Sequence, residues 1–124
     1  MDIRRLVPVF LALGLGACGG GGNVYPDTDV VEVPTFELKL ATGIQKDRGT
    51  MQAGTLEYSG QGELVSVFRK YVSAMKAQGW QSRNEEVAGD KAVATLGKEV
   101  RTCSLQFTQT QGTIRAVIKI TPPK

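Results

Sequence analysis

The side chains that usually perform catalysis are sparse in this chain of 124 residues, which contains no histidine and two cysteines. Without histidine, neither a Ser-His-Asp nor a Cys-His nucleophile can be assembled, and the commonest metal ligand is missing. Glu85 and Glu86 are neighbours in a segment with weak strand character, so their carboxylates point to opposite faces. Asp27 and Asp29 lie in a segment that we expect to be flexible, which would not hold them in a catalytic geometry. We therefore predict that the protein is not an enzyme and that it binds no metal and no cofactor.

The N-terminal segment has the composition of a secretory signal. Residues 1–5 form a short basic stretch, and residues 6–15 form an apolar run interrupted by one proline and one glycine. This run is too short to span a bilayer, which takes about 20 residues. Small residues then precede Cys18, as they do at signal cleavage sites. We predict a signal peptide over residues 1–17 that is cleaved between Ala17 and Cys18.

The sequence Leu15-Gly16-Ala17-Cys18 resembles the lipobox of bacterial lipoproteins. This resemblance implies a diacylglyceryl group on the Cys18 thiol and an acyl chain such as palmitate on the amine that cleavage frees. Two or more acyl chains anchor a protein stably to a lipid bilayer, whereas one chain binds it marginally. The alternative is an ordinary cleaved signal in which Cys18 is incidental. Gly19 stands where some lipoproteins have aspartate, which resembles the outer-membrane pattern of enteric-type bacteria. We expect localisation in the cell envelope, on the periplasmic face of the outer membrane.

A flexible tether is expected after the lipidation site. Residues 19–22 are all glycine, the most flexible composition available, and residues 23–34 contain two prolines and several acidic side chains. About 15 residues of this kind would have an r.m.s. span of about 20 Å. We predict a lipidated cysteine and tether over residues 18–34. The alternative is that the valines in this segment form an edge strand or pack on the domain; they are Val30, Val31 and Val33.

The strongest helical pattern runs from Gln61 to Gln78. Its apolar residues recur at steps of three and four, which aligns them on one face: Leu64, Val67, Phe68, Tyr71, Val72 and Met75. Gly60 is the expected N-cap, and Gly79 supplies the left-handed position after the helix. Such a face usually packs against a sheet. The alternative is a binding face whose members line a ligand pocket under the helix; they are Phe68, Tyr71, Met75 and Trp80.

Alternation of apolar and polar residues predicts strands on both sides of the helix. Their expected ranges are residues 36–40, 54–58, 80–87, 91–96, 101–107 and 113–121, with a loop at 41–51 and turns at 89–90, 97–98 and 111–112. The order is β-β-α-β-β-β-β, and the short links after the helix favour antiparallel neighbours. We predict an α+β domain over residues 35–124, with one antiparallel sheet and one amphipathic helix packed on one face. Cys103 alternates with Leu105 and Phe107, which indicates a buried thiol.

The helix and the strands around it resemble a family of small, uncharacterised bacterial lipoprotein domains. The motif Gly54-x-Leu56-x-Tyr58-x-Gly60 precedes the helix, which ends in Met75-x-x-x-Gly79-Trp80; Leu96, Lys98, Arg101 and Cys103 follow. In that family a helix ending in Met-x-x-x-Gly-Trp is likewise followed by strands. The resemblance spans about Pro34 to Thr121 and supports the envelope compartment and the fold. It carries over no catalytic residue.

The net charge and the distribution of basic residues limit the classes of partner that we expect. The formal net charge is +3, and the basic residues after the leader are scattered along the chain, so we expect no nucleic-acid surface. We expect a lipoprotein that binds the bilayer through its acyl anchor and displays a non-enzymatic binding or scaffold domain to an envelope protein. The alternative is a small-ligand carrier or an inhibitor-type protein with an apolar pocket under the helix.

Overall fold

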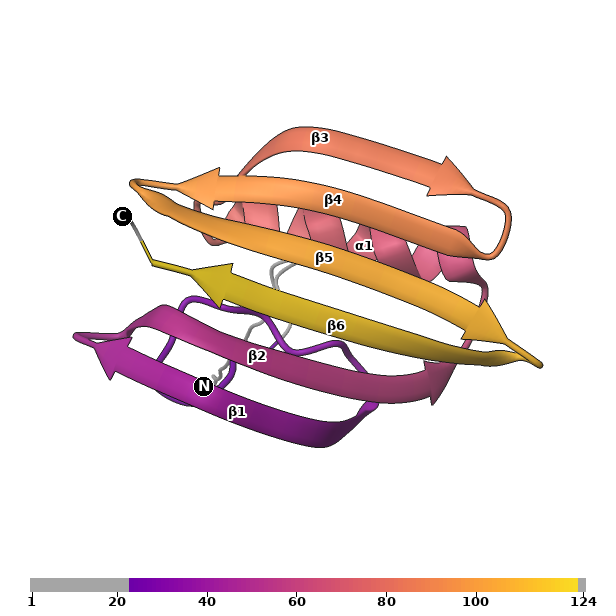
Figure 1. The fold of residues 1–124 in the computed structure, drawn as a ribbon, viewed down its shortest axis with the longest axis horizontal. Helices are drawn as coiled ribbons and strands as arrows, with labels where there is room; N and C mark the ends of the chain where they lie inside the picture. Colours follow the sequence, from indigo (N-terminus) through magenta and orange to yellow (C-terminus); the bar gives the residue numbers. More distant parts are fainter. Residues whose placement is uncertain (1–22, 123–124) are drawn as a thin grey trace, which may run out of the picture.

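The computed structural model describes residues 23–122. The predicted signal peptide, its cleavage position at Ala17 and the predicted lipidation site Cys18 lie outside these residues. The described part of the chain forms strands and a helix in the order that Figure 1 shows: β1 Glu37–Asp47, β2 Thr50–Gln61, α1 Leu64–Ala77, β3 Gln81–Ala88, β4 Lys91–Lys98, β5 Arg101–Thr110 and β6 Thr113–Thr121.

All the strands belong to one antiparallel sheet with the spatial order β1-β2-β6-β5-β4-β3. Strand β6 lies inside the sheet, between β2 and β5 (Figure 1). Its alternate residues are buried on the side of the helix: Ile114, Ala116, Ile118 and Ile120. The predicted fold class, one antiparallel sheet with one helix on one face, is confirmed.

The helix begins later than predicted. Glu63 is the N-cap, and its carboxylate accepts hydrogen bonds from the backbone N–H groups of Val65 and Ser66 at 3.2 and 3.0 Å. Gly60, the predicted N-cap, lies within β2 instead. The ring of Phe36 occupies the place that a Cβ at Gly60 would need, so the lack of a side chain at Gly60 allows Phe36 to pack there.

The predicted loop over residues 41–51 is wrong, because β1 and β2 extend through it as a long hairpin. The turn lies at Arg48 and Gly49, whose φ angles of 53° and 80° match a primed hairpin turn. Strand β1 is an edge strand that is exposed along almost its whole length. It therefore lacks the alternating hydrophobic pattern by which a half-buried strand is recognised.

A bulge in β1 places Leu38 and Leu40 on opposite faces of the sheet, whereas the alternation that predicts a strand over residues 36–40 would place them on one face. Leu38 pairs with Tyr58, whereas Leu40 pairs with Glu57, so the register shifts by one residue at Lys39. A shift of one residue moves the following side chains to the opposite face of the sheet. Leu38 therefore lies on the helix side and Leu40 on the outer side.

The predicted turn at Gly97-Lys98 is also wrong, because β4 continues through both residues. The turn lies at Glu99 and Val100, and Glu99 has a φ of 59°. Gly97 is covered by the guanidinium of Arg83, which fills the space that a Cβ would take. Arg83 is distant from Gly97 in the sequence, so local sequence alone could not show that this glycine lies in a strand rather than in a turn.

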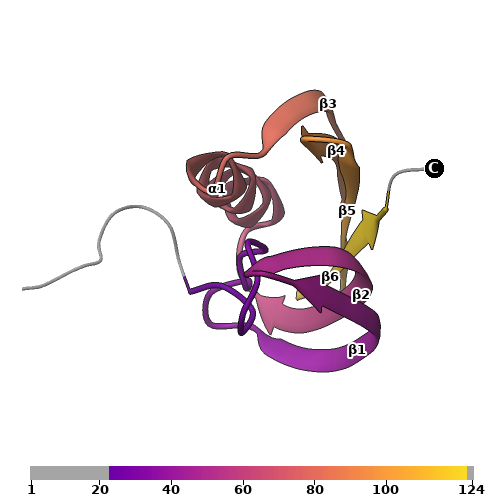
Figure 2. The ribbon, with the colours of Figure 1, turned by 90° about the vertical axis from the view of Figure 1, so that its left-hand side faces the viewer.

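The helix covers only part of the inner face of the sheet. Six strands spaced by about 4.8 Å make a sheet more than 20 Å wide, about twice the diameter of a helix. Helix α1 contacts β3, β4 and β5, and the N-terminal segment, residues 23–36, lies beside it on the same side of the sheet (Figure 2). Val30, Val31 and Val33 of this segment are buried. The predicted tether is therefore corrected: from about residue 24 the chain packs on the domain, as the alternative stated.

Candidate functional site

The predicted binding face lies in the core. Phe68, Tyr71, Met75 and Trp80 are each no more than 1% exposed. The rings of Phe68 and Tyr71 pack against Phe107 of β5, with centroid distances of 5.6 and 5.7 Å. The hypothesis of a packed helix face fits this arrangement, and these four side chains are not available to a ligand in this structure.

The N-terminal segment, beside the helix, contacts three of the four side chains that were predicted to line a ligand pocket under the helix. The Tyr71 hydroxyl donates a hydrogen bond to the Val31 carbonyl, and the Val31 N–H donates to the Met75 sulfur at 3.4 Å. The Trp80 indole N–H donates to the Asp29 carbonyl at 2.9 Å. The side chains predicted to bind a ligand thus bind the protein's own chain.

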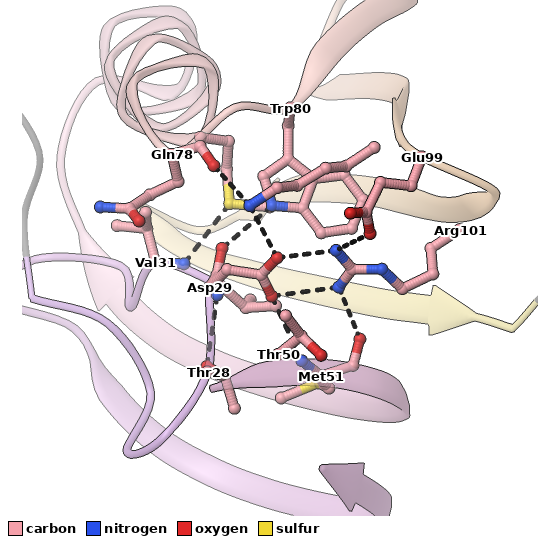
Figure 3. Close-up of polar contacts among 12 residues, drawn as sticks. Thr28, Asp29, Val31, Thr50, Met51, Gln78, Trp80, Glu99 and Arg101 are labelled. Atoms are coloured by element: carbon pink, nitrogen blue, oxygen red, sulfur yellow. Dashed lines mark hydrogen bonds and ion pairs between the residues drawn. The ribbon is translucent and has the colours of Figure 1, made fainter. Parts of the chain in front are cut away.

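The Asp29 carboxylate is the centre of this docking contact (Figure 3). It accepts two hydrogen bonds from the Arg101 guanidinium, at 2.8 and 3.1 Å, and one from the Met51 N–H at 3.2 Å. The Lys98 ammonium lies 2.9 Å from the same carboxylate. We call Asp29, Lys98, Arg101 and Trp80 the Asp29 cluster.

The other members of the Asp29 cluster are held by further contacts. Arg101 is 1% exposed; its guanidinium donates to the Met51 carbonyl at 2.9 Å and lies 5.0 Å from the Trp80 ring centroid. Lys98 donates to the Gln78 carbonyl, at the C-terminal end of α1, at 2.7 Å. The cluster therefore joins the N-terminal segment, the helix end and the β4–β5 hairpin at one point.

The electrostatics of the cluster favour the ionised carboxylate. Burial by itself raises the pKa of Asp29, but hydrogen bonds from Arg101, Lys98 and the Met51 N–H, with the charge of Arg101, lower it from 3.8 to about 2. The pKa of Arg101 is raised in turn, chiefly by its hydrogen bond to Asp29. Both groups stay charged at neutral pH. They form a paired, hydrogen-bonded and buried ion pair, which suits a structural contact rather than proton transfer.

Sequence reasoning missed the Asp29 cluster, because Asp29 and Arg101 are 72 residues apart and no local pattern joins them. The prolines and glycines near Asp29 indicated a flexible segment, and this indication outweighed a signal for a buried aspartate. That signal is a single aspartate directly before Val30 and Val31. An acidic side chain next to apolar residues that must be buried requires a cationic partner.

Cys103 is buried, as predicted. Burial, with a smaller contribution from the charge of Asp29, raises the pKa of its thiol from 9.0 to about 12. The thiolate is the nucleophilic form of cysteine, so this environment suppresses its reactivity.

The outer face of the sheet, opposite the helix, carries polar side chains and no covering element among the described residues (Figure 2). Glu57 and Arg115 form a two-point ion pair across β2 and β6, with distances of 2.9 and 2.8 Å. They line a hollow of about 580 Å³ together with Lys39, Lys91, Gln106 and other polar residues.

Residues 23–122 contain no group of three or more acidic, cysteine or histidine side chains arranged to hold a metal ion. No helix within this part of the chain is long and apolar enough to cross a membrane. Comparisons of the chain with protein-family models, with curated proteins and with solved structures found no match.

Proposed function

We propose that this protein is a lipid-anchored bacterial lipoprotein whose folded domain binds another protein of the cell envelope without catalysing a reaction. The signal at Leu15–Cys18 supports the anchor, and the absence of histidine from the chain supports a non-catalytic role. The thiol of Cys103 is buried, and its raised pKa suppresses its reactivity, which is consistent with that role. Gly19 after the cysteine favours the outer membrane.

The observation that carries this proposal is that the packed chain begins close to the expected anchor. The Asn23 carbonyl already accepts a hydrogen bond from the Glu32 N–H at 2.8 Å, and Val24 pairs with Val31. The five residue steps from Cys18 to Asn23 reach at most about 17 Å when fully extended. Acyl chains on Cys18 would therefore hold the domain near the lipid headgroups on a short tether.

The outer face of the sheet is the surface that we assign to the envelope partner. It leaves polar and charged side chains available, among them Gln106 and the Glu57–Arg115 pair. Leu40, which the bulge turns to this side, is 48% exposed and adds an apolar contact at its margin. Apolar and charged groups combined on one face are typical of non-obligate protein interfaces.

Labelling with a palmitate analogue in bacterial cells tests the anchor. The wild type should incorporate the label, and Cys18→Ser should not. Cys103→Ala is the matched control, because it removes the other cysteine and should keep the label. Globomycin, which blocks the lipoprotein peptidase, should accumulate the uncut lipidated precursor. Label on Cys18→Ser, or none on the wild type, would contradict the anchor.

Site-specific photocrosslinking in intact cells tests the partner surface. A photoreactive residue at Gln106, on the outer face, should yield one reproducible protein adduct. Lys70 is the control position, because it is exposed on the helix at the opposite side of the domain. Equal adducts from both positions, or none from Gln106, would argue against this surface.

A further inference from the structure

The turn that joins the N-terminal segment to β1 has an unusual backbone conformation. The Phe36 N–H donates a hydrogen bond to the Val33 carbonyl at 3.2 Å, which closes a β-turn with Pro34 at its second position. Thr35, at the third position, has a φ of 67°. Turns of this kind normally place glycine or asparagine there, because a β-branched residue is strained at positive φ. Contacts outside the turn must therefore hold it closed.

The residues before this turn form a unit with its own hydrogen bonds. We call residues 23–33 the N-terminal arm. The Tyr25 N–H donates to the Val30 carbonyl, and the Glu32 N–H donates to the Asn23 carbonyl, both at 2.8 Å. Neither bond includes the turn, so the arm can keep its conformation when the turn opens.

The contacts that fix the arm on the domain also lie outside the turn (Figure 3). The Asp29 carboxylate pairs with Arg101 and Lys98, and the Val31 carbonyl accepts a hydrogen bond from the Tyr71 hydroxyl. All of these partners follow the turn in the sequence by more than 30 residues. A second copy of the chain therefore offers the same partners, in the same geometry, to an arm that reaches it from outside.

The position of Phe36 limits the necessary rearrangement to a single turn. Its ring packs over Gly60 of β2, which fixes the chain on the far side of the turn. Rotating Thr35 to an extended conformation with negative φ relieves its strain and leaves Phe36 in place. The arm then points away from its own domain. Its valines, among them Val30 and Val31, which are fully buried in the closed form, need another apolar surface.

We propose that two copies of the chain exchange their N-terminal arms at this turn and form a dimer with two-fold symmetry. Each arm places its Asp29 carboxylate against Arg101 and Lys98 of the other copy. The exchange keeps the contacts of the arm and replaces two strained turns at Thr35 with extended hinges. The arm lies on the helix side of the sheet, so both outer faces can stay uncovered (Figure 2). The exchange requires neither the acyl anchor nor an envelope partner.

Two substitutions at Thr35 test the role of the turn in opposite directions. Light scattering during size-exclusion chromatography, on protein purified in a neutral detergent, gives the dimer fraction over a range of concentrations. Thr35→Gly tolerates the closed turn and should lower the dimer association constant at least about tenfold. Thr35→Pro holds φ near about −65°, forbids the closed turn and should raise this constant by a similar factor. Gln111→Gly is the matched control, because Gln111 also has positive φ but lies in the β5–β6 turn. It should dimerise as the wild type does.

A mixture of two charge-reversed variants tests whether the arm is the element that is exchanged. Asp29→Arg has an altered arm and an intact site, whereas Arg101→Asp has an intact arm and an altered site. Neither variant can form the native Asp29–Arg101 pair alone, but a dimer of one copy of each restores it once between the copies. We expect a 1:1 complex in the mixture and no dimer of either variant alone. This test also decides the proposal should Thr35→Pro not fold.

Three results would overturn the proposal. One is a wild type that stays monomeric at every concentration beside a folded, monomeric Thr35→Pro. Another is a dimer whose association constant is the same in Thr35→Gly and Thr35→Pro, which would place the interface elsewhere. The third is a mixture of Asp29→Arg and Arg101→Asp that yields no 1:1 complex.

Discussion

Replacing Asp29 by asparagine tests whether the Asp29 cluster holds the N-terminal segment on the domain. Asparagine keeps the size and one carbonyl oxygen but removes the negative charge. It leaves the guanidinium of Arg101, which is 1% exposed, and the nearby Lys98 ammonium without their shared counter-ion. Breaking a buried ion pair by removing one partner costs about 3–5 kcal/mol. We expect Asp29→Asn to lower the free energy of unfolding by about 3 kcal/mol at pH 7.

The pH dependence of this loss follows from the lowered pKa of Asp29. A change from 3.8 in the unfolded chain to about 2 in the folded protein corresponds to about 2 kcal/mol. Because the folded pKa is the lower one, this stability is fully present above pH 4 and is lost as the pH falls toward 2. The wild type loses it on acidification, whereas Asp29→Asn has no such carboxyl to protonate. The difference in stability between the two proteins should therefore shrink toward pH 2.

Urea unfolding followed by far-UV circular dichroism at several pH values between 2 and 7 measures this difference. Circular dichroism is preferable to fluorescence, because the single tryptophan, Trp80, contacts the substituted site. Asp27→Asn is the matched control. Asp27 lies two residues earlier and its carboxylate is 85% exposed, so its loss should change stability by less than about 0.5 kcal/mol. A loss below 1 kcal/mol in Asp29→Asn at pH 7, or the same loss at pH 7 and pH 2, would refute the reasoning.

Three further predictions address other contacts. Gly60→Ala should destabilise the protein by about 1–3 kcal/mol, because its Cβ would collide with the Phe36 ring; an unchanged urea midpoint would exclude this contact. Cys103 should react with a thiol reagent at the rate of global unfolding, because burial excludes the reagent and raises the thiol pKa to about 12; rapid labelling under native conditions would contradict this. Glu63→Ala should lower the free energy of unfolding by about 0.5–2 kcal/mol, because the helix loses its N-cap. Glu63→Gln should lower it less, because the amide oxygen still accepts a hydrogen bond; equal losses in urea unfolding would indicate that only the charge matters.

Local patterns in the sequence were sufficient to predict most of the fold. The strict alternation of Ile114, Ile118 and the residues between them reflects one buried face of β6, and it requires no knowledge of the partner strands. The helix is equally local, since a repeat of three and four residues brings Phe68 and Met75 to one face wherever the helix lies. The turn at Gln111-Gly112 could be placed from its glycine, and both residues adopt the positive φ that a primed hairpin turn requires.

The candidate site was far less accessible to such reasoning. The helix face was identified as apolar, but its partner, the segment around Val31, had been assigned to a flexible tether. A ligand pocket was thus an open alternative until the position of that segment was known.

The sequence by itself determined the order of the elements, the buried face of the helix and the lack of histidine, because each of these depends on neighbouring residues or on composition. Lipidation at Cys18 stays a prediction. The tertiary structure decided where the folded domain begins. A six-stranded sheet is too wide for one helix to cover, so the uncovered strands bury the nearest remaining apolar residues of the chain, Val30, Val31 and Val33. Burying these valines takes Asp29 out of water, and Arg101, which is distant in sequence, supplies the charge that a buried carboxylate needs.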